Sequence, residues 1–218
     1  MTNRSDDDVL DRAAAVAESI PASEARKRPK PGERRVQILQ TLASMLEQPG
    51  AERVTTSALA ARLGVSEAAL YRHFASKAQM FEGLLDFIET SVFTLVNQIA
   101  EREPAGAPQA RRMVSALLQF AEKNPGMVRV MVGDALVFEH DRLGARMVQF
   151  FDRIESQLRI GLRQGGDAAG SLSASADAQV QASLLTSFAV GRLQRYARSG
   201  FKRQPTEQLE AALRLIAL

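Results

Sequence analysis

The chain of 218 residues contains no cysteine, no tryptophan and only two histidines. The lack of cysteine excludes disulfide bonds, thiol nucleophiles and thiolate zinc sites. The sequence also has no apolar run of the roughly 18 residues that a membrane span needs, and no basic-then-apolar leader. We therefore expect a soluble cytoplasmic protein that does not bind membranes.

The same shortage of reactive side chains argues against an enzyme. His140 lies in Glu139-His140-Asp141, but consecutive helical residues diverge by about 100° and cannot converge on one metal. We interpret this group as a polar surface cluster. No glycine-rich phosphate loop joins a strand to a helix. We expect no enzymatic activity, no cofactor and no metal.

Charge is unevenly distributed, although the net charge is only +3. Residues 1–25 carry six acidic and two basic side chains, whereas residues 26–35 carry six basic and one acidic. We predict that residues 1–32 form a disordered arm, acidic and then basic, because such segments have too few apolar groups to fold alone. The basic part is either a solubilising tail or an arm attracted to phosphates. Its position beside the motif described next favours the arm.

Residues 53–77, RVTTSALAARLGVSEAALYRHFASK, have the pattern of a helix-turn-helix. Gly64 suits the end of the first helix, where a positive φ is needed. Ser66 can then cap the second helix. The apolar residues that should point inward from both helices are Leu59, Leu63, Val65 and Leu70.

The second helix of this motif should present small and polar side chains to solvent, namely Ser66, Ala68, Ala69, Tyr71, Arg72 and His73. Small residues followed by hydrogen-bond donors suit insertion into the major groove of DNA. Thr55 and Thr56 can each cap the first helix or bond a phosphate, and Lys77 is placed to reach the DNA backbone. The alternative is a hairpin buried in a helical bundle. The basic flank favours double-stranded DNA as a partner.

No stretch of the chain alternates as a strand does, so we predict an all-α fold of about nine helices. Residues 33–77 should form a DNA-binding domain, and residues 78–218 a helical regulatory and dimerisation domain. Helix 135–163 resembles a coiled-coil segment, and residues 165–176 are predicted to form a loop. Besides the two helices of the motif, the expected helices span residues 33–48, 77–103, 109–123, 125–132, 135–163, 177–199 and 206–218.

Apolar stripes predict which helix faces lie in the core. In helix 33–48 the stripe is Val36, Leu39, Leu42, Ala43 and Leu46. In helix 77–103 it is Phe81, Leu84, Leu85, Ile88, Val92, Leu95, Val96 and Ile99. Phe87 and Phe93 lie off this second stripe, so each either meets another helix or is an exposed anchor for a protein partner.

The arrangement of an N-terminal helix-turn-helix, a long linking helix and an all-helical remainder resembles the TetR family of DNA-binding regulators. The motif GVSEAALYRHFASK, residues 64–77, is highly specific for that family. The resemblance implies a homodimer in which the last two helices of each subunit form a four-helix interface. Apolar residues suited to that packing, or to the core of a single chain, include Leu184, Phe188 and Leu193, with Val180, Leu185, Val190, Leu209, Leu213 and Ile216 beside them.

Within the TetR family, the chain resembles the nucleoid occlusion factors. The similarity covers about residues 34–218 and includes EKNPG at 122–126 and RSGFKRQPTEQLEA at 198–211. It implies a nucleoid-associated protein that binds scattered chromosomal sites and, on DNA, antagonises polymerisation of the division protein FtsZ. The positions implied to contact FtsZ are Phe87, Lys123 and Asn124. The chain departs from the family pattern at Leu95, where a basic residue can occur, and at Gln119, where glycine can occur.

An ordinary ligand-responsive TetR repressor is the competing interpretation. Such a protein would hold a small molecule in its C-terminal half, between aromatic walls with a few polar groups. This half has one tyrosine and several phenylalanines, which disfavours a pocket of that kind. A filled C-terminal core would favour a protein partner, and an apolar cavity of several hundred Å³ would favour an inducer.

Overall fold

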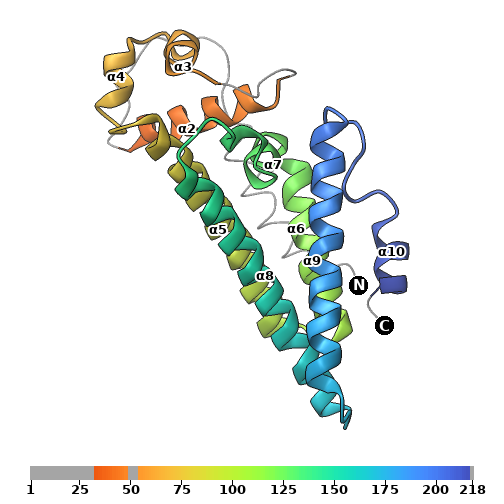
Figure 1. The fold of residues 1–218 in the computed structure, drawn as a ribbon. Helices are drawn as coiled ribbons and strands as arrows, with labels where there is room; N and C mark the ends of the chain where they lie inside the picture. The colour runs from red at the N-terminus through yellow and green to blue at the C-terminus, as the bar shows by residue number, and fades with distance from the viewer. Residues whose placement is uncertain (1–31, 49–53, 217–218) are drawn as a thin grey trace.

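The computed structural model describes residues 32–48 and 54–216, and within these ranges every regular element is a helix (Figure 1). This confirms the predicted all-α fold. The predicted arm lies almost entirely outside the described residues. The helices are α2 Glu33–Leu46, α3 Thr56–Leu63, α4 Glu67–Tyr71, α5 Lys77–Arg102, α6 Ala107–Lys123, α7 Pro125–Met131, the 3-10 helix η1 Asp134–Leu136, α8 Asp141–Ala168, α9 Ala174–Arg198 and α10 Leu209–Ile216.

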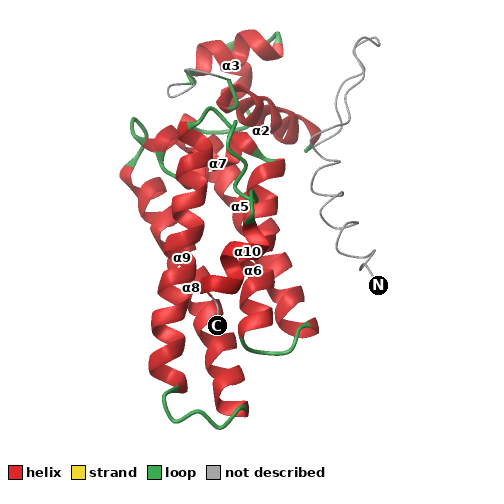
Figure 2. Cartoon of the chain, turned by 90° about the vertical axis from the view of Figure 1, so that its right-hand side faces the viewer, coloured by secondary structure: helices red, strands yellow, loops and turns green. Residues whose placement is uncertain are grey.

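Helices α2, α3 and α4 lie together at one end of the molecule, where α5 begins (Figure 1). Helix α5 then runs down the body beside α8, while α8 and α9 form a long antiparallel hairpin (Figure 2). The short helix α10 packs on the flank of α9, and Leu209 and Leu213 are its buried residues. The helix-turn-helix is therefore joined to the body mainly through α5 and through the contact of α2 with α7.

The predicted apolar stripe of α5 is confirmed, because all eight of its residues are buried. Phe93 is buried as well, with its ring against Phe150 at a centroid distance of 5.5 Å and the Arg153 guanidinium 3.8 Å from its centroid. The off-stripe position of Phe93 is therefore explained by contact with α8. Phe87 remains only half-buried, although its ring lies 6.1 Å from that of Phe120.

The predicted boundaries of α8 are wrong at both ends. The helix begins at Asp141 because His140 caps it, with Nδ1 accepting from the backbone N–H of Arg142 at 3.3 Å. It continues to Ala168, through glycines that we predicted to be loop. A Cβ atom on Gly165 would lie 2.4 Å from Cα of Gly106. These glycines therefore allow α8 to cross the start of α6 closely, which composition alone does not distinguish from a loop.

The stripe predicted for α2 is partly wrong. Its fully buried residues are Ile38, Leu42 and Leu46, whereas Leu39 and Ala43 are half-buried and Val36 is 47% exposed. The prediction assumed that other helices cover only one face of this helix, but α2 contacts α3, α5 and α7. The side of α2 that faces the body leaves Val36 exposed and forms one wall of the groove described below.

Candidate nucleic-acid interface and partner groove

The two helices of the helix-turn-helix are capped as their sequence predicts. Thr55 Oγ1 accepts from the backbone N–H of Ala58 at 3.1 Å, and Ser66 Oγ accepts from that of Ala69 at 3.3 Å. Gly64 ends α3 with φ of 64°, a conformation that costs little without a Cβ atom. Thr56 instead donates to a Glu67 carboxylate oxygen at 2.7 Å, which ties the start of α3 to the start of α4.

Helix α4 presents the surface that the sequence indicates. Ser66, Ala68, Tyr71 and Arg72 are exposed, and Ala69 and His73 are half-buried. On the opposite side, Leu70 and Phe74 are each only 1% exposed and anchor the helix to the core. The Arg35 guanidinium donates to the backbone carbonyl of His73 and lies 4.1 Å from the centroid of the Phe74 ring. The exposed face is therefore held rigidly, and its contact with DNA remains a prediction.

Lys77 has an intrachain partner that the sequence did not indicate. Its ammonium group donates to the carboxylate of Glu139, in the segment between η1 and α8, and lies 5.7 Å from the centroid of the Phe81 ring. The Glu139 side chain is only 9% exposed. In this conformation Lys77 links the helix-turn-helix to the body and is not directed at a phosphate.

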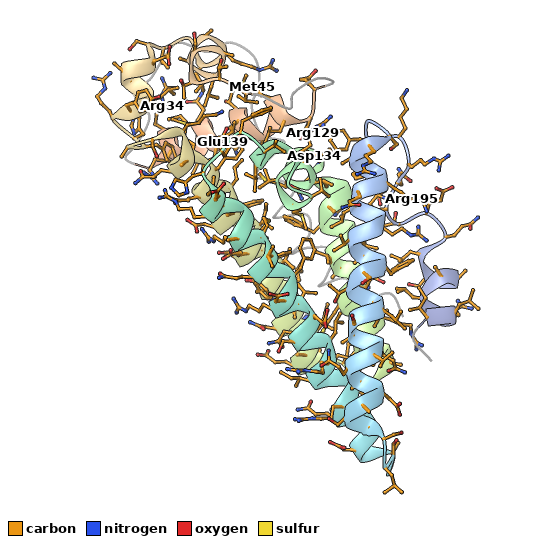
Figure 3. The ribbon with its side chains drawn as sticks, in the orientation of Figure 1. Arg34, Met45, Arg129, Asp134, Glu139 and Arg195 are labelled. Atoms are coloured by element: carbon orange, nitrogen blue, oxygen red, sulfur yellow. The ribbon has the colours of Figure 1, made fainter. Side chains whose placement is uncertain are left out.

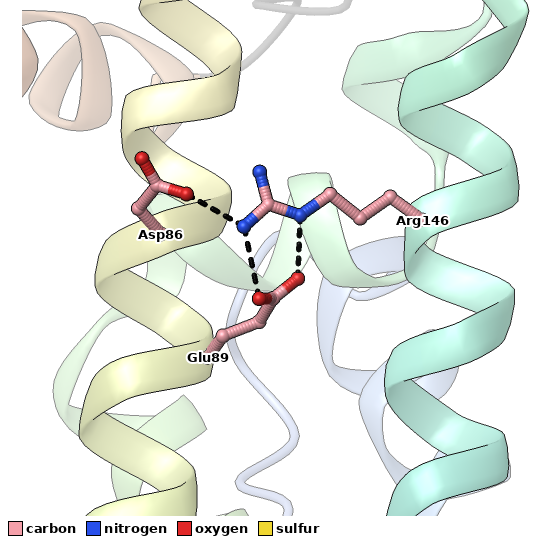
Figure 4. A network of polar contacts seen from close by, with 3 residues as sticks. All are labelled: Asp86, Glu89 and Arg146. Atoms are coloured by element: carbon pink, nitrogen blue, oxygen red, sulfur yellow. Dashed lines mark hydrogen bonds and ion pairs between the residues drawn. The ribbon is translucent and has the colours of Figure 1, made fainter.

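Further ion pairs join α5 to α8. The Arg146 guanidinium donates to both carboxylate oxygens of Glu89, at 2.6 and 2.9 Å, and to Asp86 at 2.6 Å (Figure 4). Arg142 pairs with Glu82 at 2.7 Å one turn earlier. The hydrogen bond to Glu89 raises the pKa of Arg146 above its ordinary value, and Asp86 adds to this. The bidentate geometry fixes α5 against α8.

Phe87 on α5 and the adjacent residues Lys123 and Asn124, which begin 36 positions later, line one groove of about 400 Å³. Its walls are α2, α5 and the junction of α6 with α7, so it opens between the helix-turn-helix domain and the body. Phe87 and Leu84 provide its α5 wall, and Lys123 is exposed at the α6 end. The remaining lining residues are Val36, Leu39, Gln40, Ala43, Ser44, Glu47 and Met127.

Asn124 has a different local role from the one that its position suggests. Asparagine before a proline is a common helix cap, and Asn124 stands at the N-cap position of α7, but its side chain makes no capping hydrogen bond. Its Nδ2 instead donates to the backbone carbonyl of Phe120 at 2.8 Å, so it satisfies an otherwise unpaired acceptor in the last turn of α6. Asn124 is 9% exposed, which leaves Lys123 as the more accessible polar residue of this wall.

Sequence reasoning missed the α2 wall of the groove. Val36, Leu39 and Ala43 were assigned to the core because they share an apolar stripe with Leu42 and Leu46, and their apolar character alone gives no signal of exposure. The two departures from the family pattern do not line the groove. Leu95 is 8% exposed in the core, and Gln119 lines a separate concavity together with α10 residues such as Leu209.

The residues predicted for a dimer interface occupy different environments. Leu184 is 53% exposed and Phe188 is half-buried, but Leu193 is completely buried within its own chain. Leu193 is therefore a core residue, and predicting it as an interface residue was wrong. Its apolar character fitted either role. Besides Leu184, the exposed apolar side chains on α8 and α9 include Val148, Ile160 and Val180.

Two features that would suggest other site types are missing from the described part of the chain. No group of histidine, aspartate and glutamate there is arranged to hold a metal ion. Among the described helices, none combines the length and the apolar character that a bilayer crossing requires.

Comparison with known proteins identifies the family. Residues 38–84 match the family model of the bacterial regulatory proteins of the tetR family, and residues 109–217 match that of the SlmA-like, tetracyclin repressor-like C-terminal domain. The nucleoid occlusion factor SlmA of Alteromonas mediterranea is 49% identical over 175 residues, which are 80% of this chain and 89% of that protein. The chain belongs to the SlmA family.

Other SlmA proteins show how much of the chain is shared. That of Photobacterium profundum is 49% identical over 185 residues, 84% of this chain and 94% of its own length. That of Salmonella newport is 46% identical over 194 residues, 88% of this chain and 98% of its own length. The Salmonella protein is thus matched almost completely, while about two dozen residues of this chain lie outside the alignment.

Solved structures agree with the fold of the SlmA family member described here. The TetR family regulator PfmR from Thermus thermophilus superposes with a TM-score of 0.65 at 22% identity, covering 84% of this chain and 95% of its own. The regulator FadR from Bacillus subtilis, solved with stearoyl-CoA, superposes with a TM-score of 0.64 at 15% identity, covering 83% and 96%. At these identities the similarity concerns the fold alone.

Proposed function

We propose that this protein binds chromosomal DNA through its helix-turn-helix and, while bound, antagonises the assembly of FtsZ polymers over the nucleoid. The observation that carries this proposal is the convergence of Phe87, Lys123 and Asn124 on one groove. Phe87 lies on α5, whereas Lys123 and Asn124 lie at the junction of α6 with α7, and the family resemblance implies the same role for all three. A common location is what a single binding site for a partner requires.

The DNA-binding part of the proposal is supported by the surface of α4. Ser66 and Ala68 provide a small, exposed start of the helix, and Tyr71 and Arg72 provide exposed donors further along. This order allows close approach to base edges and hydrogen bonding to bases or phosphates. Thr55 Oγ1 accepts from the backbone N–H of Ala58, which leaves its O–H available to donate to a phosphate. Thr56 donates its O–H to Glu67 and would have to rearrange first.

The dimer part of the proposal is supported by the exposed apolar residues of α8 and α9. Val148, Val180 and Leu184 are each more than half exposed in the single chain. Association of two α8–α9 hairpins about a two-fold axis would bury them in a four-helix interface, in which α8 takes the place that the sequence prediction gave to the last helix of the chain. It would also present two α4 helices to the two halves of a palindromic DNA site.

The groove suits a short peptide with an apolar anchor and acidic character. Phe87, Leu84 and Val36 offer apolar contact, and Lys123 offers a positive charge at the rim. An aromatic on a rigid helix is a common anchor point for a partner, and a rim charge contributes to specificity and the association rate. The helix that carries Phe87 is fixed against α8, because its neighbour Asp86 and Glu89 both pair with Arg146.

The test is FtsZ polymerisation with GTP, followed by light scattering and sedimentation, with and without DNA that the protein binds. We expect the protein on DNA to reduce the polymer signal, and DNA alone to leave it unchanged. DNA sites are first mapped across the chromosome, and scattered sites are expected. Normal polymerisation in the presence of the DNA-bound protein would show that the FtsZ part of the proposal is wrong.

The geometry gives less support to a ligand-responsive repressor. The interior between α5, α6, α8 and α9 is filled by large buried side chains, including Phe120, Phe150 and Leu118. The apolar groove lies outside this interior and has an α2 wall, so a molecule bound there would touch the DNA-binding domain directly. We therefore favour a protein partner for it.

A further inference from the structure

A second concavity, of about 630 Å³, lies where α9 ends and the chain turns toward α10. Four basic residues line it, Arg192, Arg195, Lys202 and Arg203, and we call them the basic cluster. The other lining residues are Gln204, Glu207 and Gln208. Glu207 is therefore the single carboxylate among the residues that line this concavity. In Figure 3 Arg195 projects from the upper part of α9 toward this connection.

The connection that carries the basic cluster is held by defined hydrogen bonds. Ser199 Oγ accepts from the backbone N–H groups of Lys202 and Arg203, at 3.1 and 2.9 Å. Arg192 donates to the backbone carbonyls of Pro205 and Glu207, and its guanidinium lies 4.8 Å from the centroid of the Phe188 ring. The backbone of the connection is thus fixed at Ser199, and the Arg192 guanidinium is held by two carbonyls and an aromatic ring rather than by a carboxylate.

The positive charge of the cluster is not balanced by nearby acids. Within residues 32–48 and 54–216, Arg195, Lys202 and Arg203 form no ion pair. Burial lowers the pKa of Arg192, and the charge of Arg195 lowers it further, while Glu207 partly offsets the effect. Burial is the largest of these causes, and the contribution of Arg195 reflects a like charge nearby.

A fifth arginine lies beneath the same connection. Arg129 of α7 is only 8% exposed, and its guanidinium lies 5.1 Å from the centroid of the Phe201 ring. Its Nε has no hydrogen-bond partner among the described residues, and Arg129 forms no ion pair there. A buried cation without a counterion is costly. It adds to the field that favours an anionic group at this surface.

The chain itself contains a segment with the complementary charge. Residues 6–24 include Asp6, Asp7, Asp8, Asp11, Glu18 and Glu24. This segment lies outside the described residues. The SlmA of Salmonella newport, matched over 98% of its length, leaves about two dozen residues of this chain unaligned, and both family models begin after residue 37. The acidic segment therefore lies outside the residues that the family models match.

The acidic segment can reach the basic cluster. An extended chain spans at most about 3.5 Å per residue, so twenty residues before α2 extend up to about 70 Å. The longest helix of the body, α8, has 28 residues and is about 42 Å long at 1.5 Å per residue. A tethered segment also acts at an effective concentration in the millimolar range, which makes weak charge pairing sufficient.

We propose that the acidic segment of residues 6–24 docks on the basic cluster of its own chain. The cluster offers a fixed array of cations, whereas the basic run that follows the segment in sequence is predicted to be a flexible arm available to phosphates. Docking closes this concavity to other polyanions and leaves the helix-turn-helix free to bind DNA. The proposal does not depend on FtsZ binding.

The absence of cysteine allows a direct test in the full-length protein. Donor and acceptor dyes are attached through Asn3→Cys and Ala211→Cys, the second being exposed on α10. The doubly labelled chain is diluted tenfold into unlabelled protein so that energy transfer reports on one chain. We expect efficient transfer at low salt and at least a twofold loss in 0.5 M NaCl, because salt screens exposed charge pairs.

Two charge changes identify the surfaces. Arg195→Glu with Arg203→Glu should reduce transfer at least twofold, and so should Asp6→Asn with Asp7→Asn and Asp8→Asn. The matched control is Arg159→Glu with Arg163→Glu, which changes the charge equally on exposed α8 positions and should leave transfer unaltered. Circular dichroism verifies that each variant is folded.

Three results would overturn the proposal. In the first, Arg195→Glu with Arg203→Glu leaves energy transfer unchanged, and deletion of residues 2–25 tightens DNA binding. That combination would place the acidic segment on the basic arm. In the second, the same double variant binds DNA more weakly while energy transfer is unchanged, which would mean that the basic cluster binds DNA. Loss of transfer on dilution into unlabelled protein would place the segment on the partner subunit.

Discussion

Lys77, the first residue of α5, is ion-paired with Glu139, 62 positions later in the chain. The pair joins the helix-turn-helix domain to the segment that leads into α8. It also orients the helix that follows α4. A residue that the sequence indicates as a phosphate contact therefore has a structural role in this conformation.

Lys77→Ala should destabilise the protein by about 2–4 kcal/mol, because it leaves the nearly buried Glu139 carboxylate without its partner. Urea unfolding measures this change. Glu139→Gln should cost less, since an amide is easier to bury than an unpaired charge. If Lys77→Ala leaves the unfolding midpoint unaltered but lowers the salt slope of DNA binding by about one, the lysine acts on phosphate after all.

Tyr71→Ala should weaken DNA binding by about 1–3 kcal/mol without lowering stability. The side chain is 45% exposed on the outer face of α4, so little core contact is lost. Fluorescence anisotropy over a salt series gives the affinity, and thermal unfolding provides the control for folding. Unchanged affinity for specific DNA would remove Tyr71 from the proposed interface.

Val36→Glu and Lys123→Asp should each reduce inhibition of FtsZ polymerisation several-fold while DNA affinity stays within about twofold. Both residues line the groove and are exposed, so the substitutions place negative charge where an acidic peptide is proposed to bind. Light scattering with saturating DNA measures the effect. Arg163→Asp, exposed on α8, is the control. Inhibition by both groove variants at the level of the unmodified protein would argue that FtsZ binds elsewhere.

Leu184→Glu should convert the proposed dimer to a folded monomer, since Leu184 is 53% exposed in the single chain. Leu193→Glu should instead unfold the protein, because it buries a charge in the core. Sedimentation velocity and circular dichroism distinguish these outcomes. A wild-type protein that sediments as a monomer at micromolar concentration would contradict the dimer.

Stability should fall above pH 10 through Tyr196. Burial raises the pKa of its phenol above the ordinary 10.0, and Glu122 and Glu47 raise it further. Above pH 10 the unfolded chain therefore loses this proton before the folded chain does, so folding stability declines by up to about 1.4 kcal/mol per pH unit from this group. Tyr196→Phe should decline less steeply. Urea unfolding between pH 9 and 11 measures the free energy of unfolding of both proteins. If it declines with the same slope in the wild type and in Tyr196→Phe, Tyr196 makes no such contribution.

The elements that the sequence predicted well are those governed by local rules. The caps at Thr55 and Ser66, the left-handed turn at Gly64 and the buried stripe of α5 depend on nearby residues and on helical periodicity. The all-α class followed from the same periodicity. Each of these features is encoded within a few turns of chain, so a single sequence suffices to find it.

The features that the sequence could not give depend on distant partners. The pairing of Lys77 with Glu139, the second covered face of α2 and the burial of Leu193 are set by tertiary packing. The glycines at 165 and 166 were predicted to be loop because their contacts with Gly106 and Ala174 cannot be read from composition. The family resemblance named Phe87, Lys123 and Asn124, but it did not supply the α2 wall that completes the groove.

The close packing of α2 on α7 couples the groove to the DNA-binding domain. A Cβ atom on Gly126 would lie 2.1 Å from the carbonyl oxygen of Ala43, so the backbones of α2 and α7 are in close contact here. Helix α2 also forms one wall of the groove. A peptide that shifts α2 must also shift the helix-turn-helix that rests on it. By thermodynamic linkage, the factor by which DNA changes affinity for the peptide equals the factor by which the peptide changes affinity for DNA.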